Sequence, residues 1–238
     1  MFDATVTGGV LQVSQPAARW LSSGWDGGFH DSDVAYNISV PDGWERTDLT
    51  EYVGERRERA GFAESGPALL TGVDLAHLRG ARDGSIIAYA TAGVSNPAVL
   101  PMDAREARED ESLADDSAVS DTSIGTVNVI VGTTRALSDG ALTNLLAVAA
   151  EAKTATLLAE TGFTGTTTDA VVVGTTRAGD ETAFTGSATE IGASTRVCVR
   201  DAIRASLHSR YANRELPDSV DDAKYGTVTS HLAEVFTP

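Results

Sequence analysis

A loop rich in glycine and threonine, Thr164-Gly165-Thr166-Thr167-Thr168-Asp169, runs directly into a stretch of valines and is the first candidate for chemistry. Such a loop offers main-chain amides, hydroxyl groups and one carboxylate to a bound molecule. Its side-chain types therefore suit ligand binding beside an acidic group. The same composition also suits a plain connection between a helix and a strand, so the loop alone leaves both interpretations open.

Lys153 is the second candidate, because the whole chain contains only one other lysine, Lys224. On an expected helix it continues an inward stripe formed by Leu142, Leu146 and Ala149. Glu151 lies on a different line, since residues two apart on a helix point about 200° apart. An ammonium group on an apolar stripe either takes part in chemistry or extends past that stripe into water. The spacing alone favours neither. An inward ammonium needs a counter-charge, because a lone buried charge is costly, so we expect a carboxylate, foremost Asp169, within ion-pair reach of Nζ of Lys153.

Three asparagines beside expected strands and helices form a third candidate set: Asn96, Asn128 and Asn144. If they converge, their amides supply both donors and acceptors for recognising an amide substrate. The four histidines are scattered without metal-ligand spacing, and phosphate-loop, GxSxG and HExxH motifs are absent from the sequence. We therefore expect no metal. Cys198 lies on the inner stripe of an expected helix, which favours an inert core thiol over a nucleophile.

The elements that position these groups follow from periodicity. Alternating apolar residues predict strands over the first forty residues, and further strands over 68–71, 85–92, 126–131 and 170–173. Helices are expected over 48–60 after Thr47, over 139–160 between Ser138 and Gly162, and from a Ser187–Glu190 capping box to about 211. The pattern predicts an α+β fold, one mixed sheet with two long helices packed on it; a four-layer α/β/β/α sandwich is the alternative.

The hexamer Val131–Ala136 recurs as Val173–Ala178, which raises the possibility of a strand–helix duplication. Residues 101–121 differ from the rest of the chain, because eight of them are acidic and almost none is large and apolar. We expect one domain over 1–238, with an acidic loop or insertion at about 101–121.

The overall charge excludes some classes of function. The chain has 34 acidic and 18 basic residues, so its formal net charge is −16. Such a chain repels nucleic acids and anionic membranes, and one cysteine excludes a disulfide scaffold. No apolar run reaches the length of a membrane helix, and the first residues do not resemble a signal peptide. We expect a soluble, cytoplasmic protein adapted to high salt.

Folding should therefore depend on salt. Screening extends over only about 3 Å in molar salt but over roughly 30 Å at 10 mM, where surface carboxylates repel one another. We expect circular dichroism to show a lower melting temperature after desalting. Equal melting temperatures in low and molar salt would contradict the adaptation to salt.

Several short segments together resemble the adenosylcobinamide amidohydrolases of corrinoid salvage. They recur in the family's order and cover nearly the whole chain outside the acidic stretch: Leu21-Ser22-Ser23 with Gly27-Gly28, Ala92–Asn96, Gly125–Ile130, Glu151–Thr154, Thr164–Ala170 and Thr185–Gly192. Two positions depart from the family pattern, which usually has glycine at Thr167 and threonine at Ala150.

The resemblance implies hydrolysis of the amide between the corrin side chain and aminopropanol, giving adenosylcobyric acid. That reaction needs an activated nucleophile, donors for an oxyanion and a proton for the amine. The catalytic candidates are Asp169 or Glu151 as base and Lys153 as the cation, with a threonine nucleophile among residues 166–168 as a competing mechanism. The substrate-binding candidates are Asn96, Asn128, Gly165, Thr166, Thr168 and Glu190.

We expect no cofactor, because the corrinoid is the substrate, and possible assembly into a homo-oligomer. The alternative function is that of a corrinoid-binding protein that does not cleave its ligand. A structural module without a small-molecule site is a third possibility. Incubation with adenosylcobinamide in high salt separates them, since only the enzyme forms cobyric acid.

Overall fold

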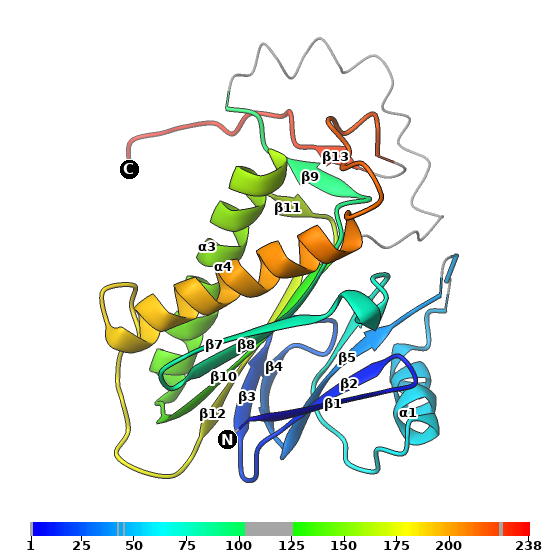
Figure 1. Ribbon diagram of the computed structural model, residues 1–238. Helices are drawn as coiled ribbons and strands as arrows, with labels where there is room; N and C mark the ends of the chain where they lie inside the picture. Colours follow the sequence, from blue (N-terminus) through cyan, green and yellow to red (C-terminus); the bar gives the residue numbers. More distant parts are fainter. Residues whose placement is uncertain (1, 42, 45, 103–125, 224–225) are drawn as a thin grey trace.

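Two long helices pack on one face of a six-stranded sheet, and a four-stranded sheet packs on its other face (Figure 1). A third helix covers the outer face of the four-stranded sheet. The computed structural model describes residues 2–41, 43–44, 46–102, 126–223 and 226–238. The acidic stretch expected at 101–121 lies outside these residues from position 103 onward.

The six-stranded sheet carries the central elements of the fold, in the order β4-β3-β12-β10-β8-β7. Strands β10 and β12 run parallel, and every other neighbouring pair in this sheet is antiparallel. Its members are β3 (Arg19–Ser22), β4 (Gly28–Asp31), β7 (Arg79–Asp83), β8 (Ile86–Ala92), β10 (Val127–Ala136) and β12 (Ala170–Thr176).

The four-stranded sheet has the order β1-β2-β5-β6 and mixes antiparallel with parallel pairing. Its strands are β1 (Asp3–Thr7), β2 (Val10–Ser14), β5 (Val34–Ser39) and β6 (Ala68–Thr71). Three short strands form a separate small sheet, in which β9 lies between the others: β9 (Pro97–Val99), β11 (Gly165–Thr166) and β13 (Thr227–Val228).

The helices in the described part of the chain are α1 (Leu49–Arg59), α3 (Asp139–Thr161) and α4 (Glu190–Arg210), with the short 3-10 helix η1 (Leu75–His77). The predicted limits of α3 are confirmed. Ser138 accepts a hydrogen bond from the N–H of Ala141, and Gly162 ends the helix at φ +77°, a conformation that favours glycine.

Two predicted helix caps are wrong. Helix α4 is capped by Thr189, whose hydroxyl accepts from the N–H of Gly192, rather than by the expected box at Ser187. A second Ser/Thr two positions later places its hydroxyl at the first free amides, and sequence spacing alone does not separate the two. Helix α1 begins after Asp48 rather than Thr47, and Asp48 makes no side-chain cap.

The repeated hexamer lies side by side in the structure. Val131 pairs with Val173 and Gly132 with Gly174 across the parallel strands β10 and β12. A Cβ at Gly132 would come within 2.5 Å of the Phe2 ring, and one at Gly174 within 2.4 Å of Trp20. These two rings pack edge to face at 5.4 Å between the sheets, so the repeated glycine makes room for an aromatic pair. Duplication itself stays a hypothesis.

The α+β class is confirmed, with two long helices packed on a mixed sheet. The layer order also matches the alternative, helices against sheet against sheet against helix, because three separate apolar clusters lie between successive layers. The sequence did not predict strand β7, which is polar and largely exposed. No helix in the described ranges is long and apolar enough to cross a membrane.

Candidate active site

The carboxylate of Asp169 is the centre of a tight polar cluster where the parallel central strands β10 and β12 begin. Its Oδ2 binds the ammonium of Lys153 and accepts the main-chain N–H of Thr166 at 3.1 Å. Its Oδ1 accepts the hydroxyl of the same threonine and the main-chain N–H of Val127 at 2.9 Å. Each carboxylate oxygen therefore accepts two hydrogen bonds.

The ion pair between Lys153 and Asp169 confirms the prediction that an inward lysine would have an acidic partner. Both side chains are only 10% exposed, so neither charge lies in open solvent. Gly165 allows this approach, because a Cβ there would lie 2.8 Å from Oδ2 of Asp169 and 3.4 Å from Nζ of Lys153. The Gly/Thr loop is therefore built around the ion pair.

The parallel crossover explains how these groups meet. Strand β10 leads into α3, and the chain returns through the loop at 164–169 to enter β12 beside β10. Lys153 lies two turns before the end of α3, close to where that loop begins. Asp169 directly precedes β12, opposite the start of β10, which supplies the N–H of Val127.

Asn96 joins the cluster through the neighbouring threonine of the loop. Its Nδ2 donates to Oγ1 of Thr167 at 2.6 Å, and its main-chain oxygen accepts the N–H of Thr167 at 3.2 Å. Asn96 is buried, and its Oδ1 has no hydrogen-bond partner among the residues that the structure describes. A buried acceptor without a partner costs about 1–3 kcal/mol.

Asn128 lies behind the cluster and connects the two large sheets. It donates to Oδ1 of Asn37 at 3.0 Å and to the main-chain oxygen of Leu70 at 2.8 Å, and it accepts the hydroxyl of Thr126 at 3.1 Å. The same hydroxyl also lies 2.9 Å from the main-chain oxygen of Thr168, so its one proton is shared between these two acceptors. Asn128 is 1% exposed and therefore supports the loop from within the core.

Sequence reasoning missed two members of this buried network, Asn37 and Thr91, which hydrogen-bond at 2.9 Å. A signal was present, because each is a polar residue within an otherwise apolar strand. Such residues need partners when buried, and the partner lies on the facing sheet.

The structure does not bring Glu151, Glu190 or Asn144 to the cluster. Glu151 is exposed on α3 and pairs with Arg196 of α4 at 3.5 Å. A Cβ added at Gly84, in the turn before β8, would lie 4.0 Å from Oε1 of Glu190, whereas Asn96 follows the other end of that strand. Asn144 accepts the N–H of Thr185 at 3.3 Å, near the start of α3. Glu151 therefore lies on the surface of the helical layer, and Glu190 and Asn144 lie at the end of that layer away from the cluster.

Comparison with known proteins decides the family. The adenosylcobinamide amidohydrolase model (CbiZ) matches residues 4–215. A curated adenosylcobinamide amidohydrolase of Halobacterium salinarum is 52% identical over 240 residues, which cover 100% of both chains. Another, of Methanosarcina mazei, is 30% identical over 201 residues, 80% of this chain and 90% of the relative. The chain belongs to the adenosylcobinamide amidohydrolase family.

As a member of that family, the chain is a hydrolase that acts on an amide bond, and the comparisons give no support to a protein that only binds corrinoids. Five of the six segments that carry the family resemblance contribute described residues at or beside the Asp169 cluster. Ser23, from the first of them, exchanges hydrogen bonds with Val171 where β12 begins. The exception is Thr185–Gly192, at the far end of α3 and α4.

Two other kinds of reactive site would be a cysteine nucleophile and a metal centre. Cys198 is buried under β8, and burial raises the pKa of its thiol to about 11, as expected of an inert core cysteine. Within the described ranges, no three side chains of His, Cys, Asp or Glu gather as metal ligands would.

Proposed function

We propose that this chain hydrolyses the amide joining aminopropanol to a corrin side chain of adenosylcobinamide. The products are adenosylcobyric acid and aminopropanol, and the acid re-enters synthesis of adenosylcobalamin. The family match over residues 4–215 and the full-length relative support this reaction. The proposal requires no resident cofactor, since the corrinoid is substrate, and it places the protein in the cytoplasm of a salt-rich cell.

We assign the chemistry to Lys153, Asp169 and Thr166. One observation carries this assignment: an ammonium and a threonine hydroxyl converge on the two oxygens of one buried carboxylate. A carboxylate that already accepts four hydrogen bonds has little room to bind and activate a water molecule. The hydroxyl proton of Thr166, by contrast, already points at Oδ1. The geometry therefore favours the threonine over water as nucleophile.

The proposed reaction proceeds in two stages. Oγ of Thr166 attacks the amide carbon while its proton passes to Oδ1 of Asp169, and the ammonium of Lys153 stabilises the resulting oxyanion. The C–N bond breaks, and Asp169 returns the proton to the departing amine. In the ester, Thr166 Oγ no longer donates to Oδ1 of Asp169, so a water molecule can take that position. This water then cleaves the ester, its proton passes through Asp169 to Oγ, the carboxylic acid leaves and the enzyme is regenerated.

Asn96 is assigned to substrate recognition in this scheme. Its Oδ1 is buried and has no hydrogen-bond partner among the described residues. If the covering loop moves when substrate binds, this oxygen can accept the N–H of the scissile amide or of a neighbouring corrin carboxamide. Thr167 holds the asparagine in place, and both Thr167 and Thr168 are exposed at the edge of the cluster. We therefore place the approach of the substrate along this exposed part of the loop. Gly165 and Asn128 support the loop.

Replacement of Thr166 tests the nucleophile. Thr166→Val keeps the shape of a side chain that is 7% exposed and removes the hydroxyl, so we expect a folded protein with turnover lowered at least 10³-fold. Thr166→Ser should retain measurable turnover. Mass spectrometry of the wild-type protein, quenched during turnover, should find the corrinyl acyl group on the peptide that contains Thr166.

Thr143→Val is the matched control, because Thr143 loses a similar hydroxyl at the opposite end of α3. Near-normal turnover of Thr166→Val, with no acylated peptide, would assign the attack to a water molecule instead. Absence of any cobyric acid from the wild-type protein would contradict the proposed reaction itself.

A further inference from the structure

A basic pocket lies between the end of α4 and the turns that follow β5 and β6. It has a volume of about 670 Å³, and its lining includes Arg56 of α1, Arg210 of α4 and Arg214 just beyond that helix. His77 of η1 also lines it, and Asp74 is the carboxylate among its described lining residues. The described lining thus carries three guanidinium groups and one carboxylate, so the pocket is locally positive although the net charge of the chain is −16.

The three arginines of this pocket differ from many other arginines of the protein in having no carboxylate partner among the described residues. Elsewhere an arginine commonly binds a carboxylate closely, as Arg19 binds Asp139 at 2.7 Å and Arg204 binds Glu160 at 2.8 Å. None of the three pocket arginines forms an ion pair with a carboxylate in the part of the chain that the structure describes. Their positive charge is therefore available to a bound anion.

Neutral contacts hold two of these arginines in place. Arg56 donates to the main-chain oxygens of Ser39 at 2.7 Å and Gly8 at 2.9 Å. Arg210 packs against Gly93, where a Cβ would lie 2.9 Å from its Nε. The positions of both charges are thus fixed by the fold before any ligand arrives, which lowers the entropy lost on binding.

The pKa of His77, in the wall of this pocket, is lowered from its usual value. Burial lowers its pKa, and the charge of Arg210 lowers it further, against the opposite effect of Asp74. Nδ1 of His77 lies 3.0 Å from the hydroxyl of Ser209, so the imidazole is a hydrogen-bonding group in the wall of the pocket.

We propose that this basic pocket binds a phosphate-class anion, either inorganic phosphate or a phosphate monoester. Arginine forks match phosphate oxygens in pairs, and several cations together balance a dianion. The volume is sufficient for an organic group attached to the phosphate. The pocket is distinct from the Lys153–Asp169 pair, neither member of which lines it, so the proposal does not depend on the assigned reaction.

Phosphorus NMR titration tests the site on the full chain in molar potassium chloride, held constant so that screening is equal throughout. We expect saturable broadening of the inorganic phosphate or glycerol phosphate signal by the wild-type protein. Arg214 is exposed, so Arg214→Gln should fold normally and raise the apparent dissociation constant about tenfold or more. Arg210→Gln should act in the same direction.

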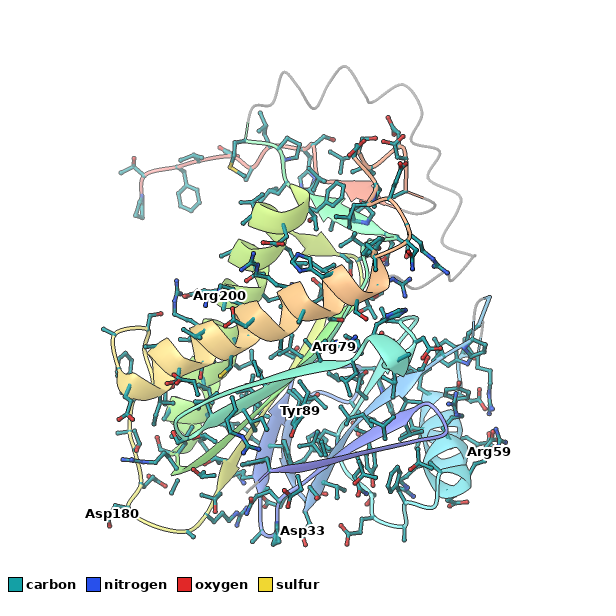
Figure 2. The ribbon with its side chains drawn as sticks, in the orientation of Figure 1. Asp33, Arg59, Arg79, Tyr89, Asp180 and Arg200 are labelled. Carbon is teal, nitrogen blue, oxygen red and sulfur yellow. The ribbon has the colours of Figure 1, made fainter. Side chains whose placement is uncertain are left out.

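Arg200→Gln is the control, because Arg200 lies on α4 (Figure 2), has an exposed side chain and pairs with Asp201. Like Arg210→Gln, this change removes one positive charge from α4, but Arg200 does not line the basic pocket. Tighter binding of the monoester would identify an organic phosphate as the ligand, and equal affinity would identify phosphate itself. No saturable broadening by the wild-type protein, or equal weakening by Arg200→Gln, would overturn the proposal. Corrinoid hydrolysis is measured separately, so its failure remains distinguishable.

Discussion

Lys153→Met is expected to leave a folded protein that has lost most of its turnover. Methionine fills the space of the lysine stem, and the carboxylate of Asp169 keeps its three other donors from Val127 and Thr166. The loss of stability should therefore stay near the lower end of the about 3–5 kcal/mol typical of a broken buried pair. Loss of the ammonium should lower the rate by about 10²–10³, the usual effect of removing a group that stabilises an oxyanion.

The measurement is single-turnover hydrolysis of adenosylcobinamide, together with thermal unfolding in molar salt. Arg200→Met is the matched control, since it removes one exposed positive charge and should change neither quantity appreciably. A folded Lys153→Met variant with wild-type turnover would show that the ion pair only supports the loop. In that case Lys153 would be a structural residue.

Asp169→Asn is expected to abolish turnover and also to destabilise the protein strongly. An asparagine has one acceptor oxygen and an NH2 group, whereas the site presents four donors. Either orientation of the amide sets a donor against donors and leaves the Lys153 ammonium without a counter-charge. We expect a loss of about 3–5 kcal/mol, or roughly 10 °C in melting temperature for a chain of this size.

Asp201→Asn is the control, because it makes the same change in an exposed ion pair of α4. The double variant Lys153→Met/Asp169→Asn should be more stable than Asp169→Asn alone, since it removes the unpaired ammonium, yet it should remain inactive. A double variant whose destabilisation equals the sum of both single changes would contradict the coupling. Normal turnover in Asp169→Asn would remove the carboxylate from the proposed reaction.

The local features of this protein could be predicted from the sequence because they depend on residues a few positions apart. Ser138 and Gly162 set the limits of α3, and the 3.6-residue period correctly placed Lys153 on its inner face. The segments that resemble the family also predicted the reaction class. They could do so because each is a short stretch of loop or strand whose residue types are recognisable without knowledge of its neighbours.

Which of those residues meet was decided only by the tertiary structure. Lys153 and Asp169 are 16 positions apart, and Asn128 reaches Asn37 across 91 positions, so both contacts depend on strand register and layer packing. Glu151 was an equally good candidate in sequence, but it faces solvent because α3 presents only one side to the sheet. Burial of the apolar faces sets that orientation, and it involves every layer at once. The sequence by itself therefore determined which polar groups were available, whereas packing brought Lys153, Asp169 and Thr166 into contact and left Glu151 outside.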